Sequence, residues 1–252
     1  MVSPVDFTVN GRVALVIGGA TGIGYAIANA LVRYGATVYI GGRTEDVGRR
    51  SAAELGVTYL PTDVADTTSV ERTVAEILSQ SGRLDIAVNG AGARLNKPAE
   101  DTTDDEWDAV FATNLTGVFR CCRAEGRVML EQGAGSIVNV ASMSAQVVNR
   151  PQRQSAYNSS KAGVVQYTKS LAAEWGARGV RVNALSPGYT ETAMTALSRA
   201  KPEIAGAWLA NTPMNRFAQP DEIAGAAVFL ASDASSFVTG IELVVDGGYG
   251  VW

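Results

Sequence analysis

The feature that constrains the fold most is a glycine-rich turn between a short apolar run and a helical segment. Residues 12–17 read Arg-Val-Ala-Leu-Val-Ile, a run typical of parallel strands that are covered on both faces. GGATGIG follows at residues 18–24, and helical periodicity continues to about Tyr34. Such a turn lets backbone N–H groups approach a pyrophosphate at the amino end of a helix. Because glycine turns also join strands to helices in many other folds, the turn alone does not establish a dinucleotide site.

The same alternation of apolar runs and helical segments continues along the chain. Further strands are predicted at residues 37–40, 57–60, 85–88, 136–141, 180–185 and 241–245. Seven strands separated by helices indicate a Rossmann-type, doubly wound, mainly parallel sheet with helices on both faces. We therefore predict a single dinucleotide-binding catalytic α/β domain over residues 1–252. Residues 190–218 break the rhythm, and they are expected to form either a substrate lid or an ordinary surface excursion.

Composition excludes several classes of function. The 252 residues carry a net charge of −4 and no basic run, so neither nucleic acid nor an anionic membrane is a predicted partner. The chain has no histidine, which excludes histidine-dependent triads and histidine metal sites within it. No apolar run reaches the roughly 18 residues of a membrane span. The start lacks a secretory signal, and the adjacent Cys121 and Cys122 suit a reducing compartment, so we expect a cytoplasmic protein.

A tyrosine, a lysine and a serine form the candidate catalytic group. Tyr157 and Lys161 are four residues apart, so on a helix their side chains share one face. The ammonium is expected to lower the pKa of the phenol from about 10, which would allow proton exchange near neutral pH. Ser142 follows the strand at residues 136–141, at the edge where open α/β sheets bind ligands. An isolated Tyr-x-x-x-Lys is commonly a solvated helix pair, but the nearby serine favours acid/base chemistry.

The end of the second strand predicts which dinucleotide binds. An acidic residue at this place would bind the ribose 2′-hydroxyl of NAD. Gly42 stands there instead and Arg43 follows, and a guanidinium can hold a 2′-phosphate. NADP(H) is therefore favoured. The glycine loop carries Thr21 where a second basic residue would strengthen this preference, so use of NAD(H) stays open, as does a solvated Arg43.

Taken together, the motifs resemble the classical short-chain dehydrogenase/reductase family over essentially the whole chain. The resemblance rests on residues 18–24, Asp63, residues 89–92, Asn114, Ser142, YNSSK at 157–161 and PGYTET at 187–192. NRPQ at 149–152 and the closing DGGYGVW are most similar to the polyol (galactitol-type) dehydrogenase and carbonyl reductase branch. Two residues depart from the pattern. Ile17 replaces the usual threonine, and Gly90 replaces a usual asparagine, which would loosen one cofactor contact.

The resemblance implies reversible hydride transfer between NADP(H) and a secondary alcohol or ketone such as a polyol, a sugar or a small ketone. It implies that Tyr157 is the acid/base, Ser142 holds the substrate oxygen, Lys161 binds the nicotinamide ribose and Asn114 positions a water. Asn114 could instead brace the backbone inside its long helix. The predicted cofactor residues are Gly18, Thr21, Gly22, Ile23, Gly24, Arg43, Thr44, Asp63, Val64, Asn89, Gly90, Ala91, Tyr157, Lys161, Pro187, Gly188, Thr190 and Thr192.

The predicted substrate residues follow the strand ends that hold this tetrad: Ser142, Ser144, Gln152, Tyr157 and Tyr189. The resemblance also implies a homotetramer. The residues themselves predict no metal site, but the resemblance leaves open whether the carboxylate of Trp252 binds a metal ion. Two alternative functions remain. A β-ketoacyl-carrier-protein reductase shares these motifs, and Arg150 and Arg153 suit an acidic carrier. A non-catalytic dinucleotide sensor would not need the intact tetrad.

Overall fold

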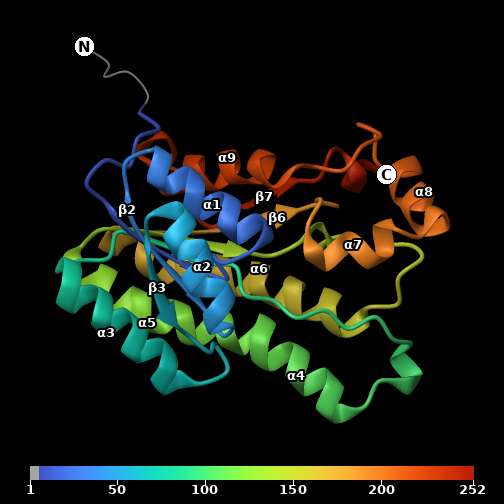
Figure 1. The fold of residues 1–252 in the computed structure, drawn as a ribbon, viewed down its shortest axis with the longest axis horizontal. Helices are drawn as coiled ribbons and strands as arrows, with labels where there is room; N and C mark the ends of the chain where they lie inside the picture. Colours follow the sequence, from blue (N-terminus) through green and yellow to red (C-terminus); the bar gives the residue numbers. More distant parts are fainter. Residues whose placement is uncertain (1–5) are drawn as a thin grey trace.

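A seven-stranded parallel sheet runs through the part of the protein that the computed structural model describes, residues 6–252 (Figure 1). The strand order is β3-β2-β1-β4-β5-β6-β7, and every neighbouring pair is parallel. The strands are β1 (Val13–Ile17), β2 (Thr37–Gly42), β3 (Thr58–Pro61), β4 (Ile86–Asn89), β5 (Gly135–Val140), β6 (Val180–Pro187) and β7 (Glu242–Val245). The predicted doubly wound sheet is confirmed, and residues 1–5 of the predicted domain lie outside the described residues.

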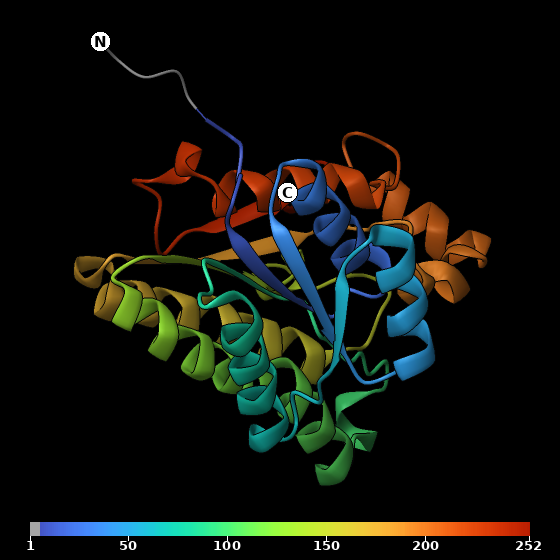
Figure 2. The ribbon, with the colours of Figure 1, turned by 60° about the vertical axis from the view of Figure 1, so that its left-hand side comes forward.

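Helices cover both faces of the sheet (Figures 1 and 2). One layer comprises α1 (Gly22–Arg33), α2 (Glu45–Leu55) and α9 (Pro220–Ala231). The other comprises α3 (Thr67–Ser81), α4 (Asp104–Asn114), α5 (Thr116–Gln132) and α6 (Ser155–Trp175). In β1, Leu15 and Ile17 pack in the core under α3 and α5, whereas Ala14 and Val16 pack under α1 and α9. This alternation explains why the strand is apolar at every position, because both of its faces are buried.

Parallel pairing brings the carboxyl ends of all strands to one edge of the sheet. The chain leaves β1 for β2 and β3, then returns to pair β4 with the other side of β1, so the strand order reverses between β1 and β4. Open α/β sheets bind their ligands in the crevice at such a reversal. This places the sequence-predicted glycine turn, which follows β1, at the centre of the ligand edge.

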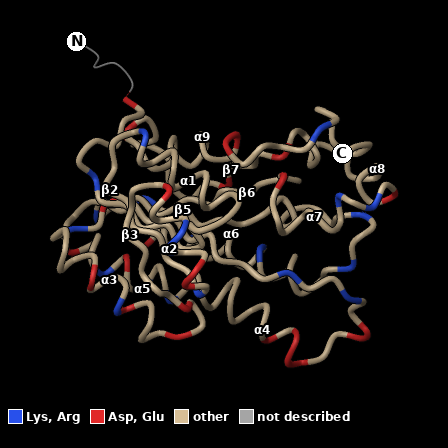
Figure 3. The backbone as a smooth tube through the Cα atoms, viewed as in Figure 1, with Lys and Arg blue, Asp and Glu red and all other residues tan. Residues whose placement is uncertain are grey.

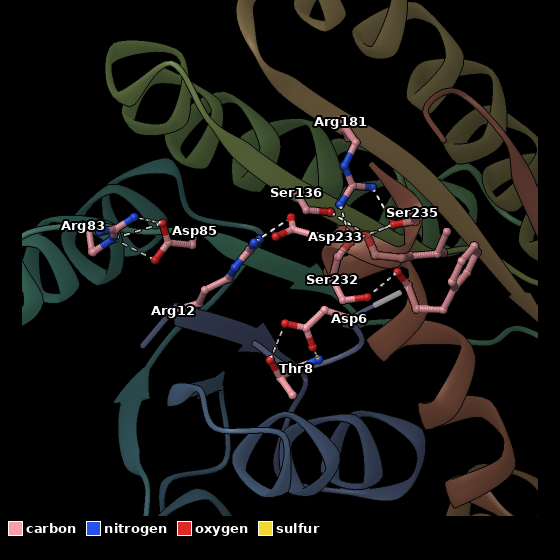
Figure 4. Close-up of polar contacts among 12 residues, drawn as sticks. Asp6, Thr8, Arg12, Arg83, Asp85, Ser136, Arg181, Ser232, Asp233 and Ser235 are labelled. Carbon is pink, nitrogen blue, oxygen red and sulfur yellow. Dashed lines mark hydrogen bonds and ion pairs between the residues drawn. The ribbon is translucent and has the colours of Figure 1, made fainter. Parts of the chain in front are cut away.

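The opposite edge of the sheet is held by polar contacts (Figure 4). Asp85, just before β4, accepts the backbone N–H of Val13 at 2.8 Å and pairs with Arg83 at 2.6 Å. Arg12 pairs with Asp233 at 2.6 Å. Lys and Arg are otherwise dispersed along the described chain rather than gathered in a stripe (Figure 3). The amino edge of the sheet is therefore bound together by its own side chains, while the carboxyl edge is where a cavity opens.

The expected long helix around Asn114 is instead two helices. α4 ends at Asn114 and α5 begins at Thr116, with Leu115 between them. The side chain of Asn114 bonds to the backbone of Ala93, in the segment that follows β4. Residues 190–218, predicted as a lid or an excursion, contain α7 (Ala193–Arg199) and α8 (Pro202–Ala210). They lie beyond the end of β6, and Trp208 of α8 is fully buried.

Candidate active site

A cavity of about 440 Å³ lies at the carboxyl edge of the sheet. Its walls come from the glycine turn after β1, the ends of β2, β4, β5 and β6, the start of α6, and residues of α7 and α8. The cavity is therefore lined by segments that are far apart in sequence and that meet because their strands are parallel.

The glycine turn brings the amino end of α1 to the cavity wall. Gly18 has φ of +78°, and a Cβ there would lie 2.9 Å from backbone atoms of Gly90, so only glycine fits. A Cβ on Gly24 would overlap the carbonyl oxygen of Gly18. The first turn of α1 has no acidic residue, and Thr21 at its N-cap makes no side-chain capping bond. Backbone N–H groups that a cap would otherwise satisfy are available there to a phosphate.

The structure places most of the predicted cofactor residues around this cavity. The wall contains Gly18, Thr21, Gly22, Ile23, Gly24, Arg43, Thr44, Val64, Gly90, Ala91, Tyr157, Lys161, Pro187, Gly188, Thr190 and Thr192. Asp63 and Asn89 are not among the lining residues. Asp63 accepts the N–H of Ala65 at 2.9 Å, and Asn89 donates to Glu125 in the core at 3.0 Å. Direct cavity contact by these two side chains is therefore not supported.

Ser142, Tyr157 and Lys161 all reach the cavity wall, as the sequence predicted. Ser142 follows β5, and Tyr157 lies in the first turn of α6. Burial raises the pKa of Tyr157, while a hydrogen bond with Ser142 and the charge of Arg94 oppose the rise. The prediction that Lys161 lowers the pKa of Tyr157 is therefore wrong. Lys161 Nζ lies 5.8 Å from the Tyr157 ring centroid, and the loss of hydration outweighs the attraction of nearby cations.

Lys161 is tied to the sheet rather than to the phenol. Its Nζ donates a hydrogen bond of 2.7 Å to the carbonyl oxygen of Val140, the last residue of β5. The side chain is buried, and burial lowers the pKa of Lys161 to about 8. A lysine with this pKa can lose or accept a proton close to neutral pH.

Asn114 braces the loop after β4. Its Oδ1 accepts the N–H of Ala93 at 2.7 Å, and its Nδ2 donates to the carbonyl oxygen of Ala93 at 2.9 Å. The Nδ2 group also donates to Ser160 at 3.0 Å. Of the two roles considered from the sequence, bracing the backbone is what these contacts show. A Cβ built on Gly92 would lie 3.7 Å from Asn114 Oδ1 and 3.8 Å from Lys161 Nζ, so both atoms border the same space.

A hydrogen-bonded chain of side chains forms the wall beyond Ser142. Ser144 donates to Asn149 Oδ1, Asn149 Nδ2 donates to the Tyr189 hydroxyl at 3.1 Å, and Tyr189 donates to Gln152 Oε1 at 3.2 Å. The Tyr189 ring stacks on Trp208 with centroids 3.9 Å apart. All three predicted substrate residues outside the tetrad, Ser144, Gln152 and Tyr189, are therefore brought together on the cavity wall.

The lining residues that the sequence did not predict include Arg94, Asn149, Gln154 and Trp208. Asn149 and Gln154 flank the predicted Gln152, and the polar character of this segment is the signal that could have found them; the structure shows both side chains buried. Arg94 follows the glycine-rich segment at 89–92 by two residues, and it was not singled out. Trp208 lies in the segment whose regular structure the sequence did not predict, so no periodicity pointed to it.

These features define the class. The amino end of α1, which can bind a phosphate, and the hydroxyls of Ser142 and Tyr157 line one cavity. This combination fits a dinucleotide-dependent oxidoreductase. The sequence model described as "Enoyl-(Acyl carrier protein) reductase" matches residues 18–250. Galactitol 2-dehydrogenase (L-tagatose-forming) of Cereibacter sphaeroides is 46% identical over 98% of both chains. D-threitol dehydrogenase of Mycolicibacterium smegmatis is 45% identical over 97% of this chain and 95% of its own.

A solved structure of a related protein has the same fold. A gluconate 5-dehydrogenase from Burkholderia cenocepacia J2315, in complex with NADP and tartrate, superposes with a TM-score of 0.93 at 34% identity and 98% coverage of both chains. The chain belongs to the short-chain dehydrogenase/reductase family, and it is an NAD(P)-dependent oxidoreductase that acts on a secondary alcohol or the corresponding ketone.

Within residues 6–252, no helix is both long and apolar enough to cross a membrane. In the same part of the chain, no three His, Cys, Asp or Glu side chains gather closely enough to hold a metal ion.

Proposed function

We propose that the protein transfers a hydride reversibly between NADP(H) and a polyol, sugar or small ketone, with Tyr157 as acid/base. The observation that carries this proposal is the position of Tyr157 and Ser142 on the wall of the cavity that α1 opens into. The two most similar relatives named above are polyol dehydrogenases, which supports a polyhydroxylated substrate. When bound, the nicotinamide ring supplies the hydride acceptor or donor.

The chain's own residues orient the substrate and move one proton. Ser142 binds the substrate oxygen, and Tyr157 takes the hydroxyl proton during oxidation or returns it during reduction. Lys161 binds the nicotinamide ribose, and its hydrogen bond to the carbonyl oxygen of Val140 holds it at the end of β5. Asn114 fixes the Ala93 backbone and, with Lys161, holds a water that relays the proton from the site.

The cofactor residues divide by position along the cavity. The turn around Gly18, Thr21, Gly22 and Gly24 holds the pyrophosphate against the amino end of α1. Arg43, exposed at the end of β2, binds the 2′-phosphate and favours NADP(H) over NAD(H). Residues 187–192 flank the nicotinamide carboxamide. Residues 190–218 act as the substrate lid, with Trp208 as its anchor on Tyr189. The working form is a homotetramer in the cytoplasm.

A β-ketoacyl-carrier-protein reductase is the second candidate. Arg150 and Arg153 are exposed in the loop that also carries Gln152, where an acidic carrier would meet the cavity entrance. A silent dinucleotide sensor is disfavoured because Ser142, Tyr157 and Lys161 converge on one cavity.

One assay separates these functions. The protein is mixed with NADPH or NADH and a panel of sugars, small ketones and an acetoacetyl thioester, and with NADP⁺ or NAD⁺ and alditols, while absorbance is followed at the nicotinamide band. Turnover of alditols and ketoses supports the proposal. Turnover restricted to the thioester supports the second candidate, and cofactor binding without any turnover supports the sensor.

A further inference from the structure

We propose that Arg94 binds an oxyanion on the substrate, a carboxylate or a phosphate, so that the preferred substrate is a polyhydroxylated anion rather than a neutral polyol. This inference deepens the proposed function and rests on it. It names the chemical class that the reacting end of the cavity accepts.

The first argument is the charge of the cavity wall. Three cationic side chains line it, those of Arg43, Arg94 and Lys161, and none of its lining residues is Asp or Glu. Arg43 follows the end of β2, where the proposed cofactor site lies. Arg94 stands at the reacting end, where its charge acts on Tyr157. An anionic substrate is therefore attracted to the same end at which the hydride and proton move.

The second argument is that the backbone carrying Arg94 is fixed. Its neighbour Ala93 is held at both its N–H and its carbonyl oxygen by Asn114, a residue with 0% exposed area. Arg94 itself makes no hydrogen bond or ion pair with any residue within 6–252. Lys97, three residues further along the same loop, pairs with Glu106 at 2.7 Å. A guanidinium that is held in place and has no protein partner is suited to bind an oxyanion of the substrate.

The third argument is the kind of hydrogen-bonding group that faces the substrate. Gln152 Oε1 accepts from Tyr189, and within the described residues its amide nitrogen has no partner, so the amide presents donors to the cavity. Asn149 Oδ1 already accepts from Ser144 and Gln154. Each hydroxyl of a neutral polyol brings a proton that needs an acceptor, whereas an oxyanion brings only acceptors. The amide donors of Gln152, together with the guanidinium of Arg94, match an oxyanion better than a neutral hydroxyl.

The test compares matched pairs of substrates. Oxidation is measured with threonate and threitol, galactonate and galactitol, and gluconate, sorbitol and sorbitol 6-phosphate, in the wild-type protein and in Arg94→Gln. A charge-assisted pair is worth about ten- to a hundred-fold in affinity, so at least one anion is expected to exceed its neutral counterpart by at least tenfold in kcat/KM. The sugar acids and the sugar phosphate separate the two sources of the oxyanion.

In Arg94→Gln the ratio of anionic to neutral kcat/KM is expected to fall at least tenfold, chiefly through KM. Any effect of Arg94 on the pKa of Tyr157 touches both members of a pair, so it cancels in this ratio. Arg94→Lys keeps the charge and is expected to retain part of the preference. Arg178→Gln is the matched control, because Arg178 is exposed beside the amino end of β6, at the other edge of the sheet.

Equal or better use of the neutral member in every pair, or an unchanged ratio in Arg94→Gln, would overturn the inference. If no alcohol is turned over, the proposed function fails, and binding decides the inference separately. Quenching of bound NADPH fluorescence by gluconate or sorbitol 6-phosphate, but not by sorbitol, and its loss in Arg94→Gln, would support an oxyanion site. An absence of such quenching would contradict the oxyanion site. Thermal melting of each variant checks that the protein is folded.

Discussion

Lys161 Nζ lies 2.7 Å from the carbonyl oxygen of Val140, so a lysine of α6 is anchored to the end of β5. This bond holds the start of α6 against the strand that Ser142 follows, and it thereby fixes Tyr157 beside Ser142. The cost is an amine that loses its hydration, which lowers its pKa to about 8. The same residue therefore opposes stability at neutral pH and supports the geometry of the site.

The first prediction concerns Lys161 and pH. The folded protein holds this lysine with a pKa of about 8, whereas in the unfolded chain it returns to about 10.5. The unfolded state thus binds more protons between these values, and the contribution of Lys161 to stability rises with pH across that window. The free energy of unfolding of wild type minus that of Lys161→Met should rise by about 2 kcal/mol from pH 7 to pH 9.5. Urea denaturation of both proteins at the two pH values measures it.

A difference that stayed flat across this range would mean that Lys161 keeps its usual pKa in the fold. Lys169→Met provides the comparison, since Lys169 lies exposed on the same helix. Lys161→Met should also lose activity and bind the dinucleotide less tightly. An activity loss explained by unfolding alone would leave that role unsupported.

The second prediction concerns Tyr157. Tyr157→Phe keeps the ring in its cavity and removes only the hydroxyl that moves the proton. Turnover should fall nearly to zero, while the Kd for NADPH, read by fluorescence, should change less than about threefold. Residual turnover above a few per cent of wild type would exclude Tyr157 as the acid/base.

Much of this site was predictable because its motifs are local. Residues 12–34 specify a strand, a turn and a helix from near neighbours alone, and Tyr157 and Lys161 share a helix face by spacing. The pKa of Tyr157 was predicted in the wrong direction because its cause is not local. How deeply α6 lies over the end of β5, and where Lys161 finds its acceptor, depend on tertiary packing that spacing does not contain.

The break at Asn114 shows the same limit in the fold. The sequence predicts one long helix that contains Asn114. The fully buried amide instead bonds to the backbone of Ala93, twenty-one residues earlier, and α4 ends there. This partner lies far along the chain, and no pattern within the helix reveals it.

The third prediction tests this bracing. Asn114→Ala leaves both backbone groups of Ala93 without their partner, so the free energy of unfolding should fall by about 2 kcal/mol. Asn211→Ala is the control, because Asn211 is exposed and its amide caps only its own helix, at the carbonyl of Ala207. It should stay within about 0.5 kcal/mol of wild type. If Asn114→Ala were as stable as wild type, the bracing role would be contradicted, and only the proposed role of holding a water would remain for Asn114.

The fourth prediction concerns the chain of side chains at Tyr189. Tyr189→Phe keeps the stack on Trp208 but breaks the link between Asn149 and Gln152. Relative kcat/KM across a substrate panel should change more than the Kd for the cofactor, with little change in Tm. Trp208→Ala removes the stacking partner from a fully buried site, and it should lower Tm by several degrees as well. Equal losses on every substrate with Tyr189→Phe would argue against contact with the substrate.

The last prediction concerns the choice of dinucleotide. Gly42 ends β2 where an acidic residue would bind the ribose of NAD, and Arg43 lines the cavity beside it. One charge-assisted bond to a 2′-phosphate contributes about 1.5–3 kcal/mol, so kcat/KM should favour NADP(H) over NAD(H) by at least about tenfold. Arg43→Ala should erase most of this preference. No atom lies within 4 Å of a Cβ built on Gly42, so the carboxylate of Gly42→Asp fits there and should reverse the preference by repelling the phosphate. Steady-state kinetics with both cofactors measure each value, and Arg50→Ala, an exposed arginine of α2 outside the cavity wall, is the control. Equal use of both cofactors by the wild-type protein would show that Arg43 binds no phosphate.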